Sequence, residues 1–257
     1  MHHETLELPN GYTAEIHTDE SPENPFEAWD CEPPIAVLNW QRYHAKLNNY
    51  GGDELNLETL LALIPAAKWT SRAGKREILA ALPFSMAELV EAVRNAGNFK
   101  DAITHELAYD LRPSDWSEWV EYFDTMQAVA AVAGIPCHLT QSNGYSQGNS
   151  ALVFVAAPPA WAELVGAPAE GLAEQCKAAA DLWSAWAWGD VYGVADILRP
   201  DGTEAPEGAC WGFYGTDHKQ SGLLDHCHEA AKHDMATQER EAARAHDAAC
   251  RDIETAA

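Results

Sequence analysis

Basic residues are scarce in this sequence. Lysine and arginine together number 16, against 40 aspartates and glutamates, and the formal net charge is −24. Proteins that bind DNA or RNA directly do so through clustered Lys and Arg side chains that neutralise phosphates. The composition therefore argues against a nucleic-acid ligand. So acidic a surface favours solubility and attracts basic partners, although it is equally compatible with a surface that has no partner.

Long apolar runs and paired cysteines are also missing. No stretch approaches the roughly 20 consecutive apolar residues of a membrane helix, and the start, Met1-His-His-Glu-Thr, lacks the basic and apolar regions of a signal peptide. We therefore expect a cytoplasmic protein with no membrane partner. The six cysteines form no Cys-x-x-Cys pair, which argues against a disulfide framework and a zinc site. We expect reduced, mostly buried thiols and no metal or other cofactor.

The charge is unevenly distributed along the chain. Residues 1–41 hold nine acidic side chains and no Lys or Arg, whereas residues 68–76 hold four of the 16 basic ones, a basic island on an acidic background. The Pro-rich acidic loop 19–32 can present carboxylates to a basic protein surface, in the way that phosphates meet Arg and Lys. The alternative is a merely solvated loop. The candidate partner-binding residues are Asp19, Glu20, Glu23, Glu27, Asp30 and Glu32.

Strand and helix signals alternate in blocks and predict an α+β fold. Asn10-Gly11 between alternating residues predicts a β-hairpin, and the apolar run 35–40 predicts a strand buried on both faces. Ser85 with Glu88 forms a capping box that predicts a helix over 86–96, ended by Gly97. A second helix is expected from residue 114 or 115 to Gly134.

We therefore expect one α+β domain over residues 1–222, with a mixed or antiparallel sheet and packed helices. The sheet should unite the N-terminal hairpin, the 35–40 strand, the strands within 135–156 and the 191–214 hairpin. A helical insertion should span about 55–134. Residues 223–257 should form a charged, solvated C-terminal helix.

The richest stretch in glycine and tryptophan is residues 183–222. Val191–Leu198 and Ala209–Tyr214 predict a hairpin with a long Pro- and Gly-containing tip. Glycines inside its arms mark bulges, or places where a ligand or another backbone comes close. They can equally make room for the neighbouring aromatic core. If a pocket exists here, its candidate residues are Trp188, Asp190, Tyr192, Trp211 and Tyr214.

Two further patterns suggest catalysis, and both are weak. Gly144-Tyr-Ser-Gln-Gly148 matches the nucleophile elbow around Ser146, but that motif requires a following helix, and the residues that follow predict a strand. The cluster 225–229 with His233 and Asp234 suggests a metal site. Neighbouring residues on a helix diverge by about 100°, so His226, Cys227 and His228 cannot converge on one ion. Glu229 and His233, four residues apart, could supply two ligands, but the others would have to come from elsewhere in the chain. No catalytic residue is therefore assigned.

Four motifs follow one another along the chain: Ser21-Pro-Glu-Asn-Pro-Phe-Glu-Ala-Trp-Asp30, the glycine-centred loop 143–149, Trp188-Gly-Asp-Val-Tyr-Gly193 and Cys210-Trp-Gly-Phe-Tyr-Gly215. Their order resembles that in a family of uncharacterised proteins encoded by bacteriophages and prophages. The resemblance covers roughly residues 4–40 and 135–222; the helical block between them and the tail depart from the family's shorter pattern. It implies a phage accessory protein made inside a bacterium, and it brings no catalytic residues.

These observations favour a non-enzymatic, acidic phage accessory protein that binds a host protein. Counter-defence or nucleic-acid mimicry, by occupying the nucleic-acid-binding surface of a host factor, is the expected role. The competing classes are a hydrolase or metal-dependent enzyme, and a small-ligand-binding protein with its pocket among the Trp and Gly residues of 183–222.

Overall fold

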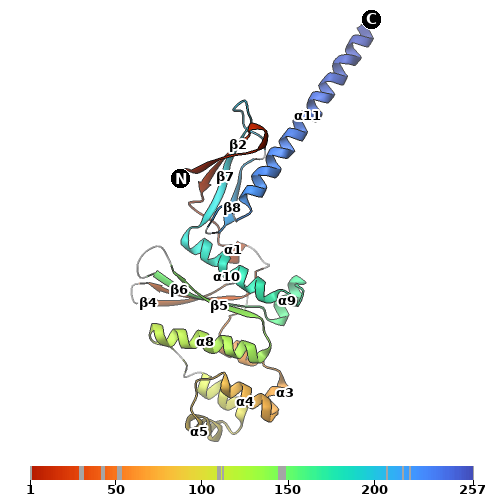
Figure 1. Cartoon of the computed structure of the whole chain (residues 1–257). Coiled ribbons are helices and arrows are strands. Elements are labelled where there is room, and N and C mark those ends of the chain that lie inside the picture. Colours follow the sequence, from red (N-terminus) through yellow and green to blue (C-terminus); the bar gives the residue numbers. More distant parts are fainter. Residues whose placement is uncertain are drawn as a thin grey trace. The chain divides into compact units, whose positions relative to one another are not determined.

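The computed structural model has two compact units. Unit 1 contains residues 1–23 and 185–257, and unit 2 contains residues 24–184. Each unit has its own four-stranded antiparallel sheet (Figure 1). The α+β class is as predicted, but the strands expected in one sheet are divided between two. The structure describes residues 2–28, 32–41, 44–50, 54–108, 111, 113–143, 149–206, 208–215, 217–219 and 221–256.

Unit 1 is built on sheet A, whose strand order is β1-β2-β7-β8. Its strands are β1 (His2–Glu7), β2 (Thr13–Thr18), β7 (Val191–Leu198) and β8 (Cys210–Tyr214). The short 3-10 turn η1 (Pro9–Gly11) joins β1 to β2, and Asn10 and Gly11 have φ values of 60° and 80° there. Left-handed backbone of this kind is what an Asn-Gly pair adopts at low cost, so the predicted hairpin is confirmed.

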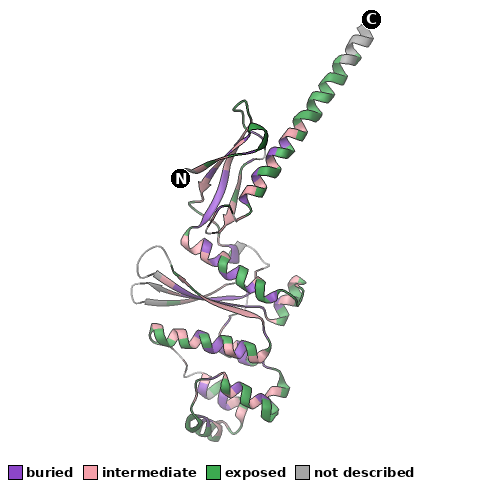
Figure 2. Ribbon diagram, viewed as in Figure 1, coloured by how far each residue is buried: buried purple, intermediate pink, exposed green. Residues whose placement is uncertain are grey.

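One face of sheet A is covered by α11 (Leu223–Ala256). The start of this helix is part of the core rather than a solvated tail. Farther along, every side chain described from Glu239 to Arg251 is exposed (Figure 2), as the charged sequence predicts. The buried cluster comprises Leu8, Tyr12, Ala14, Ile16, Tyr192, Val194, Ile197, Ala205, Leu223, Cys227 and Ala231.

Unit 2 is built on sheet B, with strand order β4-β3-β6-β5. Its strands are β3 (Ile35–Gln41), β4 (His44–Tyr50), β5 (Cys137–Asn143) and β6 (Asn149–Ala156). Ala36 and Leu38 pack with the residues of α8 (Trp116–Ala133) in one core cluster. Ile35 and Val37 point to the opposite face, because side chains alternate along a strand. All four are fully buried, so β3 is covered on both sides as its apolar run predicts.

The other helices of unit 2 surround this sheet and α8. The predicted capping box of α5 is confirmed: Ser85 and Glu88 each bond the other's backbone N–H, and Gly97 ends the helix with φ of 80°. The predicted 115–134 helix is confirmed by its Asp115 N-cap and Gly134 C-cap. The elements are α1 (Pro25–Ala28), α2 (Leu57–Ala62), α3 (Ala66–Thr70), α4 (Arg72–Ala80), α5 (Met86–Ala96), α6 (Phe99–Asp101), the π-helical η2 (Ala102–Leu107), α9 (Pro159–Val165) and α10 (Leu172–Trp188), whose last residues belong to unit 1.

Candidate acidic interface on unit 1

The acidic segment Asp19–Glu23 begins directly after β2. The backbone N–H of Asp19 donates to the carbonyl of Val191 at 2.8 Å, which ties the first residue of the segment to β7. The side chain of Asp19 turns back and accepts the N–H of Ser21 at 3.0 Å, a local turn typical of aspartate. The segment therefore starts as an ordered continuation of sheet A.

Two aromatic side chains hold the far end of the same segment. The indole Nε1–H of Trp186 donates to the carbonyl of Pro22 at 3.3 Å, and the hydroxyl of Tyr214 donates to the carbonyl of Glu23 at 2.8 Å. Burial raises the pKa of Tyr214, and the charges of Asp19 and Glu23 raise it further. Trp186 and Tyr214 are half-buried residues of unit 1, and their polar ends fix the acidic backbone, a use to which Trp and Tyr are well suited.

The anchored backbone leaves carboxylates at the surface. The side chains of Glu20 and Glu23 are exposed and that of Asp19 is half-buried. Unit 1 as a whole holds 20 acidic and 6 basic side chains, a net charge of −14. The segment therefore presents negative charge from a fixed backbone on the more acidic of the two units.

Trp211 on β8 is the large exposed apolar side chain of this region, at 49% exposure. It pairs across the sheet with Gly193, and a Cβ added at Gly193 would lie 2.1 Å from the indole Cε3. The ring of His17 on β2 lies 6.4 Å away, between centroids. Gly193 thus makes room for a neighbouring aromatic side chain, the alternative to a bulge or to the approach of a ligand or another backbone, and the indole lies directly on its backbone.

The predicted pocket residues are divided between the two faces of sheet A. Tyr192 belongs to the core under α11 and contacts His218 edge-on, with ring centroids 5.6 Å apart. Trp211 and Tyr214 pair with Gly193 and Val191, the neighbours of Tyr192 along β7, and so lie on the face turned away from α11. Asp190 is buried, and its backbone bridges the end of α10 and Gly215. Trp188 is half-buried near the end of α10.

Of the other residues predicted to bind a partner, Glu27 and Glu32 belong to unit 2. Glu27 lies exposed in α1 of unit 2. Glu32 is half-buried in unit 2, and burial raises the pKa of its carboxyl group. Asp30 lies outside the described residues. The anchored part of the predicted acidic loop is therefore Asp19–Glu23.

The His- and Cys-containing cluster of α11 is dispersed around the helix. Cys227 and Asp234 face the core, whereas His228, Glu229 and His233 are exposed. Within the described part of the chain, no three His, Cys, Asp or Glu side chains are placed to hold a metal ion. Ser146, the candidate nucleophile, lies outside the described residues.

Cys137, Cys176, Cys210 and Cys227 are free thiols. Burial raises the pKa of Cys176 to about 12 and that of Cys227 to about 11. Both thiols are fully buried, and Cys176 contacts the carbonyl of Pro136 at 3.6 Å. These two side chains are therefore the inert, buried thiols that the cysteine spacing predicts.

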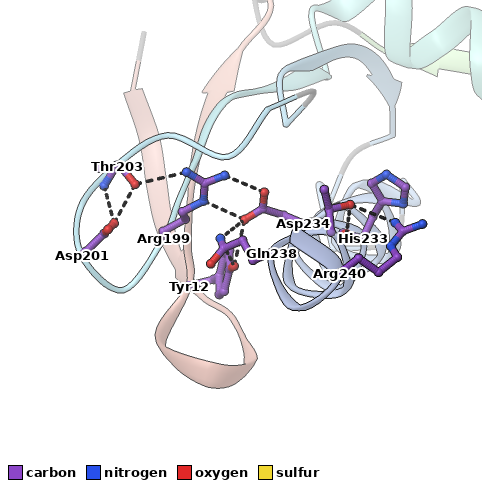
Figure 3. A network of polar contacts seen from close by, with 9 residues as sticks. Tyr12, Arg199, Asp201, Thr203, His233, Asp234, Gln238 and Arg240 are labelled. Carbon is purple, nitrogen blue, oxygen red and sulfur yellow. Dashed lines mark hydrogen bonds and ion pairs between the residues drawn. The ribbon is translucent and has the colours of Figure 1, made fainter. Parts of the chain in front are cut away.

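Asp234 of α11 is the centre of a buried polar network (Figure 3). Its carboxylate accepts two bonds from the guanidinium of Arg199, both at 2.8 Å. It also accepts the hydroxyl of Tyr12 at 2.9 Å and the amide of Gln238 at 2.7 Å. The Arg199 guanidinium, with these hydrogen bonds, lowers the pKa of Asp234 to about 2. Both carboxylate oxygens of Asp234 accept hydrogen bonds from these partners. The network therefore holds α11 against sheet A rather than offering a reactive group.

The basic island predicted at residues 68–76 forms a corner of unit 2. Lys75 lies over the ring of Phe99 at 5.2 Å and Lys100 over the ring of Trp69 at 5.8 Å, both to the centroid. Gly74 permits the contact between α3 and α4, because a Cβ there would lie 2.4 Å from the backbone of Lys68. The two cation–π contacts therefore connect α6 to α4 and to α3.

Comparisons of the chain with protein-family models, with curated proteins and with solved structures find no match. Among the helices that the structure describes, none is both long and apolar enough to cross a bilayer. The function must therefore be argued from the geometry and charge of the sites themselves.

Proposed function

We propose that this protein is a non-enzymatic binder of a basic protein surface, with Asp19–Glu23 and Trp211 as its contact site. The observation that carries the proposal is the anchored acidic backbone. Bonds from Asp19 itself, from Trp186 and from Tyr214 fix it at both ends. A segment already ordered before binding loses little conformational entropy when a partner docks.

The neighbouring aromatic residue supports the same role. Trp and Tyr are enriched among the residues that contribute most to protein–protein binding, and an exposed indole beside carboxylates suits Arg or Lys through cation–π contact. Trp211 projects from the strand that also carries Tyr214, which anchors Glu23. A basic partner would thus find both carboxylates and an exposed aromatic ring on unit 1.

The resemblance to phage-encoded proteins indicates the kind of partner. A host protein that binds nucleic acid presents Arg and Lys arranged to meet phosphates, and ordered carboxylates can occupy the same groups. We therefore propose counter-defence or nucleic-acid mimicry in the cytoplasm of a bacterial host. The net charge of −24 would draw such a basic partner toward the protein over long range.

The test is affinity purification from bacterial lysate with matched baits. The wild-type chain should retain one or more basic proteins, and the double variant Glu20→Lys/Glu23→Lys should lose them. The control Glu163→Lys/Glu170→Lys changes two exposed carboxylates of unit 2 and alters the net charge by the same amount. It should retain the partner, because the proposal depends on the position of the charge.

The retained partner is then purified for measurement of affinity. Glu20→Lys/Glu23→Lys should weaken binding about tenfold or more, and Trp211→Ala should weaken it at constant charge. Binding should fall as ionic strength rises, since salt screens exposed charges. Equal losses in the control variant, or binding indifferent to salt, would contradict the proposal.

A further inference from the structure

Unit 2 contains a cavity of about 460 Å³. Its described walls come from the start of α2, from η2 and from α8, with Leu47 of β4 beside them. Pockets of about 300–1,000 Å³ are the usual size for small-molecule sites. From its walls and charge, we infer that this cavity binds an organic amine, a cation that carries an apolar body.

The apolar wall is aromatic. Trp119 and Tyr122 of α8 both line the cavity and meet edge-on, with ring centroids 5.6 Å apart. Leu111 and Ala108 extend the same wall. Aromatic faces attract cations as well as apolar groups, and Trp is the most effective of them. The wall therefore suits a ligand that has both characters.

The charge of the lining selects a cation. Glu54 and Glu58 belong to the described lining, and no Lys or Arg does. Burial raises the pKa of Tyr122, and the nearby carboxylate of Glu54 raises it further, which places negative charge beside the aromatic wall. An anionic ligand would be repelled here, whereas an ammonium group forms charge-assisted hydrogen bonds with carboxylates.

An adjoining cavity of about 230 Å³ extends the same chemistry. It shares Leu111, Pro113 and Tyr122 with the larger one, and its described lining adds Glu118 and Glu121 but no Lys or Arg. Both cavities therefore combine carboxylates with an apolar wall around one tyrosine. Among the described lining residues of both cavities, with His105 counted as neutral, the charged side chains are all carboxylates.

The backbone around the cavity is held in an unusual form. Thr104 and His105 line it from η2, a π-helical segment over Ala102–Leu107. π-helical turns are rare and often occur at functional sites. Elsewhere in the lining, the hydroxyl of Tyr122 accepts the N–H of Leu57 at 3.2 Å, which fixes the phenol ring against the start of α2. Two specific backbone features thus shape the described lining.

Three indole compounds of similar shape test this inference by isothermal titration calorimetry. Tryptamine is the cationic probe, tryptophol is the neutral one and indole-3-acetate is the anionic one. Tryptamine should bind saturably and about tenfold or more tightly than tryptophol, because a hydrogen bond to a charged group adds to binding. Indole-3-acetate should bind most weakly. Equal binding of all three, or no saturation by tryptamine below about 1 mM, would overturn the inference.

Variants locate the site. Glu54→Gln/Glu58→Gln changes two exposed side chains and should abolish the preference for tryptamine over tryptophol. The matched control Glu163→Gln/Glu170→Gln should keep it. Trp119→Leu should weaken all three probes, and amide NMR shifts on tryptamine addition should concentrate on η2 and the start of α2. Shifts elsewhere, or a preference unchanged in the Glu54→Gln/Glu58→Gln variant, would refute this location.

Discussion

Removal of the Asp234 carboxylate should detach α11 from sheet A. Asp234 is 4% exposed and accepts hydrogen bonds from Arg199, Tyr12 and Gln238. Asp234→Ala leaves the Arg199 guanidinium and the almost fully buried Tyr12 hydroxyl without their acceptor. Removing one partner of a buried ion pair costs about 3–5 kcal/mol of folding stability. Since the Arg199 side chain remains 25% exposed to water, we expect Asp234→Ala to lower the free energy of unfolding by about 3 kcal/mol, the low end of this range.

The pH dependence of stability gives a second, independent value for the contribution of the Asp234 carboxylate. The ordinary pKa of Asp234 is 3.8, and its partners lower it to about 2 in the folded state. Each pKa unit corresponds to about 1.4 kcal/mol, so the ionised carboxylate contributes about 2 kcal/mol of stability. A lowered folded-state pKa means that this contribution is present above pH 3.8 and is lost as pH falls toward 2. Asp234→Asn should therefore remove this acid dependence.

Native-state hydrogen exchange is the suitable assay, because two units need not unfold in one transition. In Asp234→Ala, amides at the start of α11 and in β2 should lose about 3 kcal/mol of protection. Amides of α8 in unit 2 should not change. Asp247→Ala on the exposed half of α11 is the matched control, and a surface change of this kind should stay within about 0.5 kcal/mol. Equal effects of Asp234→Ala and Asp247→Ala would refute the reasoning.

Three further predictions rest on close contacts and buried thiols. Gly193→Ala should displace the indole of Trp211 and cost about 1–3 kcal/mol by overpacking; near-UV circular dichroism and urea unfolding measure both effects. Gly74→Ala should separate α3 from α4, because its Cβ would lie 2.4 Å from backbone; we expect earlier thermal unfolding of unit 2 and no change in exchange of unit 1. Cys176 and Cys227, with pKa values raised to about 12 and 11, should resist iodoacetamide at pH 8 in the native protein and react after denaturation, as read by peptide mass spectrometry.

Local signals in the sequence predicted individual elements well. Asn10-Gly11 defined a hairpin, and Ser85 with Gly97 defined both ends of a helix, because turn and cap geometry depends on neighbouring residues alone. The strand β7 has the predicted limits. The strand β4 was missed, since it lies at the edge of sheet B and its polar sequence, His-Ala-Lys-Leu-Asn-Asn-Tyr, lacks the apolar alternation of a half-buried strand.

Which strands pair with each other could not be predicted from such local signals. β2 pairs with β7, and β3 pairs with β6, across long stretches of chain. Nothing in the composition of an apolar strand specifies which distant strand lies beside it. The division into two sheets therefore depends on packing that no local pattern encodes. The same holds for the start of α11, whose few apolar residues become core only because sheet A lies against them.

The candidate interface was predicted in part. Charge counting identified Asp19, Glu20 and Glu23, because an excess of carboxylates is a property of composition. The anchors were not identified as such: Trp186 bonds a carbonyl 164 residues away, and Tyr214 one that is 191 residues away. An aromatic side chain in the sequence indicates burial, but its polar atom gives no clue to its acceptor. The amine cavity likewise combines segments from 47 to 122 and had no sequence signal.

The construction of unit 1 from two distant stretches, 1–23 and 185–257, has a consequence for biosynthesis. The hairpin β1–β2 leaves the ribosome with one edge of β2 unpaired, and its neighbour β7 follows roughly 170 residues later. At about 5–20 residues per second that delay lasts roughly 10–35 s, during which unit 2 can complete its own core. An uncovered strand edge invites pairing with other nascent chains. Glu4, Glu7 and Glu15 give every such hairpin the same negative charge, so that two unpaired hairpins repel each other.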